Sequence, residues 1–248
     1  MHEKKGVSEH IEVIISFTIF LTFVVFLLIF VNPIEKTKEK TQYLDITEKT
    51  IMQELQTDLT TFSITIEPTI ISGITSCFCF DYPTPEKVTA KDEENINTNA
   101  GTFGNTICVN PTQTTAGANK KHYKLSFSTE FTENPGTCTG PITTGGTDTT
   151  LNPGDYTLGV RNEYKKISKT QLISLNNSYN TNYQNLRSNL ALKNNFNIII
   201  KTTEGEQIAY GKIKEPKETD IIAKEIPIEI LDSEGTITPA IMNLQVWE

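Results

Sequence analysis

The chain has 248 residues, a hydrophobic content of 37%, a charged content of 21% and a formal net charge of −8. This length suits one membrane segment with one globular domain or two very small ones, and the chain is long enough to bury a core. The acidic balance argues against a nucleic-acid partner, because binding to phosphates requires a basic face.

An uncharged, apolar run covers residues 13–31. As a helix it would extend for about 28 Å at about 1.5 Å per residue, which approaches the thickness of the hydrocarbon core of a bilayer. The run is longer than the apolar part of a cleaved secretory signal, and it leads into Asn32 and Pro33 rather than a small-residue cleavage site. The sequence therefore predicts a retained, single-pass transmembrane helix in contact with membrane lipid.

The flanking charges do not decide the orientation of this helix, because lysines lie on both sides of it. Two other features favour an extracellular C-terminal part and a cytoplasmic N-terminus. One is the presence of four cysteines without the spacing of a metal site, and the other is an Asn-x-Ser acceptor for glycosylation at Asn176. The predicted location is the cell membrane.

The residues that precede the apolar run read Lys4-Lys5-Gly6-Val7-Ser8-Glu9. This junction resembles the class III signal of archaeal type IV pilins and pilin-like proteins. The resemblance covers about the first 32 residues. It implies cleavage between Gly6 and Val7 by a prepilin peptidase, and self-association or packing with pilin-like partners through the retained helix.

Beyond the apolar run, Pro33 predicts an end or a kink of the helix, and the charged residues 35–40 predict a stalk. Apolar residues at helical spacing predict an amphipathic helix over residues 41–59, and the alternation at 62–66 predicts a half-buried strand. The chain is therefore expected to contain a prepilin-like N-terminus and transmembrane helix at 1–32, a stalk and amphipathic helix at 33–60, and an extracytoplasmic β-rich domain at 61–248.

Residues 83–155 are rich in Pro, Gly and Thr and predict loops, with short strands possible at 106–109 and 122–128. A capping box formed by Ser168 and Gln171 begins a predicted helix over 169–191. Four strand-like runs follow, at 196–202, 207–212, 221–231 and 236–247. The predicted fold class is α+β, with an N-terminal transmembrane helix followed by helices packed on a mostly antiparallel β-sheet.

The cysteines are candidates for disulfide bonds. Cys77 and Cys79 lie on the same side of an extended strand, which discourages a bond between them. Each could instead pair with Cys108 or Cys138, while free buried thiols and a metal site are the alternatives. The usual zinc spacing of Cys-x(2–4)-Cys is missing, so disulfides are favoured and no metal or other cofactor is expected.

The sequence suggests no catalytic residues, because it contains neither a phosphate-binding loop nor a recognisable nucleophile and base, and His122 is the one histidine of the outer domain. An enzyme is therefore not expected. The leading hypothesis is a structural, membrane-anchored, pilin-like subunit or minor component of a type IV pilus-like surface system. The alternative is a stand-alone, single-pass surface protein whose outer domain binds a cell-surface component or ligand, since Pro33 would interrupt the continuous helix that pilins use.

Overall fold

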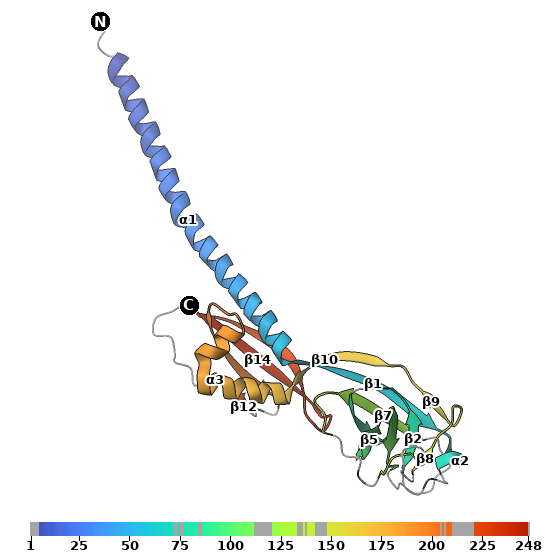
Figure 1. The fold of residues 1–248 in the computed structure, drawn as a ribbon. Coiled ribbons are helices and arrows are strands. Elements are labelled where there is room, and N and C mark those ends of the chain that lie inside the picture. Colours follow the sequence, from blue (N-terminus) through green and yellow to red (C-terminus); the bar gives the residue numbers. More distant parts are fainter. Residues whose placement is uncertain are drawn as a thin grey trace.

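The computed structural model describes residues 5–71, 74, 77–83, 86–111, 121–132, 136, 138–141, 148–203, 205, 207–209 and 221–247. Side chains are described for these residues except 5–11, 28–40, 68, 71, 121 and 207–209. Within these ranges a long N-terminal helix projects from an elongated, two-lobed head (Figure 1).

The helix α1 (Lys5–Leu55) has 51 residues and is about 77 Å long at about 1.5 Å per residue. Its helical backbone continues through residue 33, so the end predicted at Pro33 is wrong. The predicted helix over 41–59 is the last part of α1 and stops at Leu55, where β1 (Gln56–Ile66) begins at once. Threonines at 57, 60 and 61 favour the extended backbone there, because β-branched residues fit strands better than helices.

The large sheet contains ten strands of the described chain. Their order is β12 (Gln207–Ala209), β11 (Asn195–Thr202), β14 (Ile237–Trp247), β13 (Ile222–Leu231), β10 (Asn162–Ser168), β1, β7 (Lys121–Ser128), β3 (Lys87–Lys91) and β4 (Asn97–Thr98), with β9 (Tyr156–Leu158) on β1. Neighbours are antiparallel except β10 and β13, which pair in parallel at Ile167↔Ile230 and Ser168↔Leu231. This short pairing joins the two halves of the sheet.

The proximal lobe consists of β11, β13 and β14 with α3 (Lys169–Asn189) and the end of α1 packed on one face. The side chain of Ser168 caps α3 by accepting a hydrogen bond from the Gln171 backbone N–H, which confirms the predicted start of this helix. On β13, Ile228 and Ile230 are buried while Glu225 and Glu229 are exposed, so the predicted alternation is confirmed.

The distal lobe consists of a small sheet facing β1, β3 and β7 of the large sheet. The small sheet has the order β5 (Ala100–Phe103), β6 (Thr106–Val109), β2 (Phe78–Asp81) and β8 (Thr149–Thr150). Phe78 and Phe80 of β2 pack against Ile64 and Tyr123 of the large sheet, and all four side chains are at most 2% exposed. The short helix α2 (Pro68–Ile71) follows β1.

The predicted α+β class is wrong, because the described residues form mostly β-sheet. The error lies chiefly between residues 83 and 155, where β3 to β8 replace much of the predicted loop. The short strands expected at 106–109 and 122–128 are confirmed as β6 and β7. Strands of two to five residues separated by turns are too short for their alternation to stand out in the sequence.

The prediction of a membrane-spanning helix also needs correction. None of the helices in the described part of the chain combines the length and apolar character that crossing a membrane requires. The predicted single-pass location in the cell membrane, with a cytoplasmic N-terminus and an extracellular domain, is therefore not supported.

Candidate assembly surface

The C-terminal end of α1 is fixed in the core of the proximal lobe. Leu44, Ile51 and Leu55 are at most 5% exposed and pack with residues of α3, β11, β13 and β14. The ammonium of Lys224 on β13 lies 2.5 Å from the carboxylate of Glu48, which ties the helix surface to the sheet. Because several turns are packed in this way, the head holds the direction of the rest of α1.

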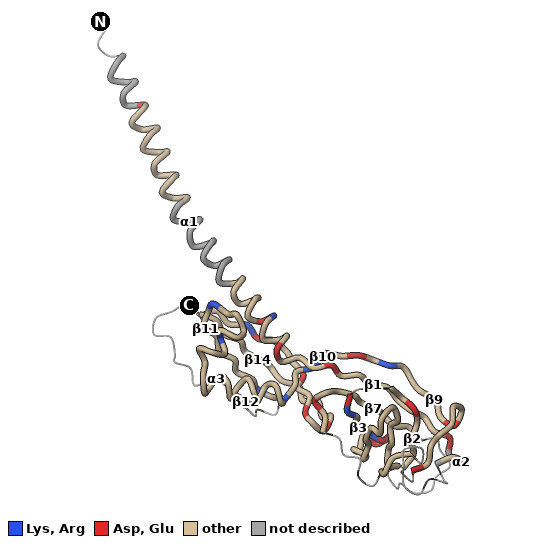
Figure 2. Tube along the Cα trace, in the orientation of Figure 1, with Lys and Arg blue, Asp and Glu red and all other residues tan. Residues whose placement is uncertain are grey.

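The middle of α1 carries an exposed, apolar surface, which we name the shaft segment (residues 12–27). The sequence of this segment contains one charged residue, Glu12 at its N-terminal end, and Figure 2 shows most of the segment in tan, the colour of uncharged residues. Eleven large apolar side chains here are 43% to 68% exposed, namely Val13, Ile14, Ile15, Phe17, Ile19, Phe20, Leu21, Phe23, Val25, Phe26 and Leu27. Consecutive residues lie about 100° apart around a helix, so these side chains surround the axis rather than form one stripe.

Two polar side chains of the shaft segment, those of Thr18 and Thr22, are hydrogen-bonded within the helix. The Thr18 hydroxyl donates to the Ile14 carbonyl at 2.8 Å, and the Thr22 hydroxyl donates to the Thr18 carbonyl at 2.8 Å. Hydroxyls bonded to the preceding turn do not need an outside partner. The shaft segment can therefore be buried in contact with other apolar groups without leaving these two donors unpaired.

Burial of this segment would stabilise an assembled state strongly. Fully burying one large aliphatic or aromatic side chain contributes about 1.5–3 kcal/mol. A helix that is apolar all round is stable only when it is covered on all sides, whereas one neighbouring helix covers one side. The geometry of the shaft segment therefore suits contacts with several neighbours.

The predicted processing site lies at the start of the same helix. Gly6 and Val7 belong to the helical backbone of α1, but their side chains are outside the described residues. The structure leaves cleavage between them as a prediction.

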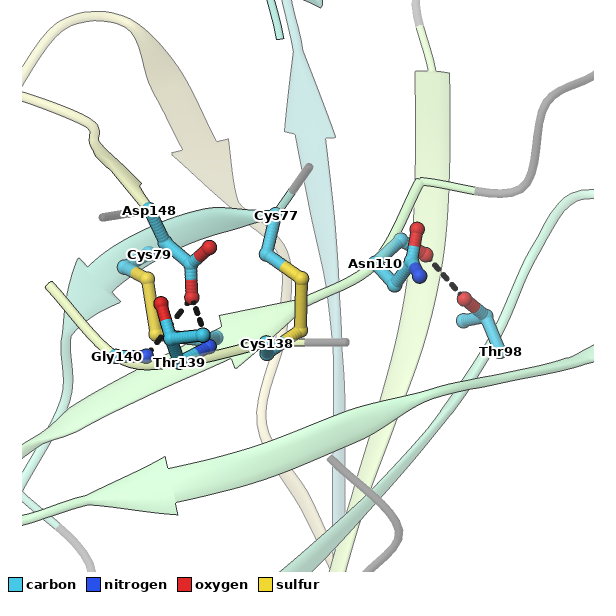
Figure 3. The surroundings of a disulfide bond; sticks show 9 residues. Cys77, Cys79, Thr98, Asn110, Cys138, Thr139, Gly140 and Asp148 are labelled. Atoms are coloured by element: carbon cyan, nitrogen blue, oxygen red, sulfur yellow. Dashed lines mark hydrogen bonds between the residues drawn. A yellow bond between two sulfur atoms is a disulfide. The ribbon is translucent and has the colours of Figure 1, made fainter. Parts of the chain in front are cut away.

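The four cysteines form two disulfides in the distal lobe, as the sequence predicted. Cys77 is bonded to Cys138 and Cys79 to Cys108 (Figure 3). The Cys79–Cys108 bond joins the neighbouring strands β2 and β6, and the Cys77–Cys138 bond closes a longer loop with a sequence separation of 61 residues. Closing loops of this length restricts the unfolded chain, which stabilises the folded lobe.

Asp148 is buried between the two disulfides, and the sequence did not single it out. Figure 3 shows its carboxylate directed at the backbone that follows Cys138. Its Oδ2 atom accepts hydrogen bonds from the N–H groups of Thr139, at 2.6 Å, and Gly140, at 2.8 Å. Asp148 therefore fixes the loop that carries Cys138.

Among the described residues, the groups of side chains close enough to hold a metal ion combine Asp148 with Cys77 and Cys138, or with Cys79 and Cys108. Metal ligation by cysteine requires the thiolate, and these sulfurs are bonded to one another. In this arrangement the four cysteines act as covalent cross-links.

Two other sequence candidates lie apart from the shaft segment and from each other. Asn176 is half-buried on α3, and its side-chain oxygen accepts a hydrogen bond from Asn180 at 2.6 Å. His122 is exposed on β7, and its Nδ1 atom lies 2.7 Å from the hydroxyl of Thr65. The structure does not bring these residues together into one site.

A groove of about 570 Å³ opens where β10 and β13 diverge. Its walls include apolar side chains of α1, β13 and β14, such as Met52, Ile228 and Ile241. Lys166 and Glu229 also line it and form an ion pair with each other. The groove lies at the junction between the two halves of the large sheet.

No protein-family model, curated protein or solved structure matches the chain.

Proposed function

We propose that the chain is a structural, pilin-like subunit whose copies assemble through the shaft segment. The observation that carries the proposal is a continuous α1 with one end fixed in the head and an exposed apolar segment beyond it. The basic residues and Gly6 that precede this helix support the same function, because they resemble a prepilin junction.

The alternative function, a stand-alone protein that binds a surface component or ligand, loses the observation that motivated it. That observation was the expected break at Pro33, and α1 continues through this residue. A continuous helix favours packing along a common axis over an isolated tether.

The first experiment compares assembly of the full chain with that of the double variant Ile15→Lys/Ile19→Lys. These residues are 53% and 65% exposed, and they lie one turn apart on the same side of α1. Ammonium groups at both positions would be costly to bury against an apolar neighbour. We expect the parent chain to form large assemblies by sedimentation velocity and negative-stain electron microscopy, and the variant to lose most of them.

The matched control is Ile96→Lys/Ile173→Lys, which adds the same charge at exposed apolar positions of the head. It should assemble through the shaft segment like the parent chain. If the shaft variant and the control assemble equally well, or if the parent chain stays monomeric, the proposed function is wrong.

A second experiment tests processing. N-terminal sequencing of the protein from its native cells should begin at Val7, and Gly6→Leu should prevent this cleavage. A native chain that begins at Met1 would remove the prepilin-like part of the proposal.

A further inference from the structure

The head has a free strand edge that runs beside β1. We name residues 156–166 the outer edge. β9 and β10 both pair with β1 on one side, through Ile64↔Leu158 and Thr61↔Asn162 among others. β13 reaches β10 only at Ile167 and Ser168. Within the described chain, no strand pairs with the other side of the outer edge, which follows the border of the head in Figure 1.

The outer edge exposes apolar side chains together with charged ones. Val160 is 78% exposed, Tyr164 is 45% exposed and Leu158 is 41% exposed. Arg161 and Glu163 lie between them and form an ion pair at 2.9 Å with side chains that are 58% and 70% exposed. An open edge with apolar side chains is a template for pairing with another strand.

A bulge shapes the outer edge near its middle. Residues 159–161 lie opposite two residues of β1, between the pairs Ile64↔Leu158 and Thr61↔Asn162. Gly159 donates to the Ser63 carbonyl at 2.7 Å, and a Cβ at this position would lie 2.2 Å from the Ser63 hydroxyl oxygen. The Val160 carbonyl accepts a hydrogen bond from the side chain of Asn162 at 3.4 Å. The Asn162 side chain thus provides the Val160 carbonyl with a hydrogen-bond donor.

We infer that a second copy of the chain adds its outer edge to this one, antiparallel, about a two-fold axis at Asn162. This register places Arg161 opposite Glu163 of the second copy, and Val160 opposite Tyr164 of the second copy. The axis repeats each pair, giving two opposite-charge pairs and two aliphatic–aromatic pairs. These are the cross-strand combinations that stabilise antiparallel strands, and a contact that pairs one patch with itself is the usual form of a two-fold interface.

Repulsion between like charges and the existing pairing with β13 disfavour other registers. An axis at Lys165 would place that lysine against its own copy, and an axis between residues 163 and 164 would place Arg161 against Lys166. An axis at Tyr164 would place Arg161 of the second copy at Ile167, where β13 already pairs. The axis at Asn162 pairs residues 158–166 of the two copies, leaves residues 156 and 157 of the outer edge unpaired, and stops at β13.

The pairing goes beyond the proposed function, because it concerns the head and involves no residue of the shaft segment. The two contacts can be separated by experiment, because each has its own variants.

A charge exchange tests the register in the full chain that carries Ile15→Lys/Ile19→Lys. This background should form dimers through the head in sedimentation velocity. Arg161→Glu or Glu163→Arg alone would place like charges opposite each other and should weaken the dimer at least tenfold. The combination Arg161→Glu/Glu163→Arg should restore it. If the background stays monomeric, if both single variants dimerise like the background, or if the combination does not recover, the inferred pairing is wrong.

Cross-linking gives an independent test. Paired residues of antiparallel strands have Cα atoms about 4.5–5.5 Å apart, a separation that a disulfide can bridge. Asn162→Cys should therefore form a bond between two copies under mild oxidation, detected as a linked peptide by mass spectrometry. Glu163→Cys is the matched control, because its two copies would lie out of register and too far apart. Equal cross-linking of both variants, or none at Asn162→Cys, would overturn the two-fold axis.

Discussion

Asp148 is the side chain on which the loop around Cys138 depends. Asp148→Ala would leave the N–H groups of Thr139 and Gly140 without their acceptor, at a cost of about 2–3 kcal/mol in the free energy of unfolding. Asp148→Asn keeps a side-chain oxygen and should lose less. Chemical denaturation measures both.

Asp155→Ala is the control for this prediction, because Asp155 accepts a similar backbone hydrogen bond from Asn152 at an exposed turn. It should cost under about 1 kcal/mol. A loss for Asp148→Ala no larger than that of the control would show that the buried carboxylate does not hold the loop.

Ionisation of the Tyr123 hydroxyl makes the free energy of unfolding depend on pH in the alkaline range. Burial, followed by the nearby charges of Asp92 and Glu93, raises the pKa of Tyr123 to about 12. Between about pH 10 and about pH 12 the unfolded chain therefore loses the Tyr123 proton while the folded chain keeps it. The free energy of unfolding falls as pH rises through this range, because the folded state then binds more protons.

The variant Tyr123→Phe tests this linkage, since phenylalanine keeps the ring that packs against Phe78 at a centroid distance of 5.2 Å. Denaturation curves between pH 9 and pH 12 should show a smaller loss of stability in the variant. The same pH dependence in both proteins would exclude Tyr123 as a source of it.

The C-terminal part of α1 has both buried and exposed side chains, and it carries an isoleucine of each kind. Ile51 is fully buried in the proximal lobe, whereas Ile46 is 48% exposed on the same helix. Ile51→Ala should lower the free energy of unfolding by about 2–4 kcal/mol, because it removes buried methyl groups and leaves a cavity. Ile46→Ala should cost under about 1 kcal/mol in the same denaturation experiment. Equal losses would mean that the end of α1 does not pack as described.

Several elements could be predicted from the sequence because their signals are local. The capping pair of Ser168 and Gln171 marks the start of α3, and the alternation around Ile228 marks β13. The path of α1 through Pro33 could not be predicted in this way. A proline weakens a helix locally, and its effect on a long helix depends on the turns that continue on both sides of it.

The candidate surfaces were predictable to different extents. The apolar residues of the shaft segment stand together in the sequence, but their role depends on what covers them, and the expected membrane span was wrong. The outer edge depends on contacts between distant parts of the chain, because the strand beside Asn162 is set by the sheet topology, which a local pattern does not encode. Asp148 accepts hydrogen bonds from residues only eight and nine positions before it, but these contacts form in a loop, which has no periodic pattern to reveal them.

The whole molecule has an elongated form, with a head at one end of a long helix (Figures 1 and 2). The exposed side chains of the shaft segment of this helix are mostly apolar. Charged or strongly polar side chains around a helix would keep it monomeric in water, and the shaft segment has few of them. Its side chains instead suit close contact with the same segment of other copies, which would place the heads side by side. The proposed assembly would require both the fixed direction of α1 and the apolar surface of its shaft segment.

The most direct measurement is photo-cross-linking from position 20 of the full chain in the cells that produce it. Phe20 is 63% exposed in the shaft segment and can be replaced by benzoyl-phenylalanine with little change in shape. The account predicts a cross-linked pair of identical chains joined at α1, and no such pair when the same probe replaces Ile173 of the head. Cross-links from position 20 to lipid or to unrelated proteins, without any pair of identical chains, would contradict it.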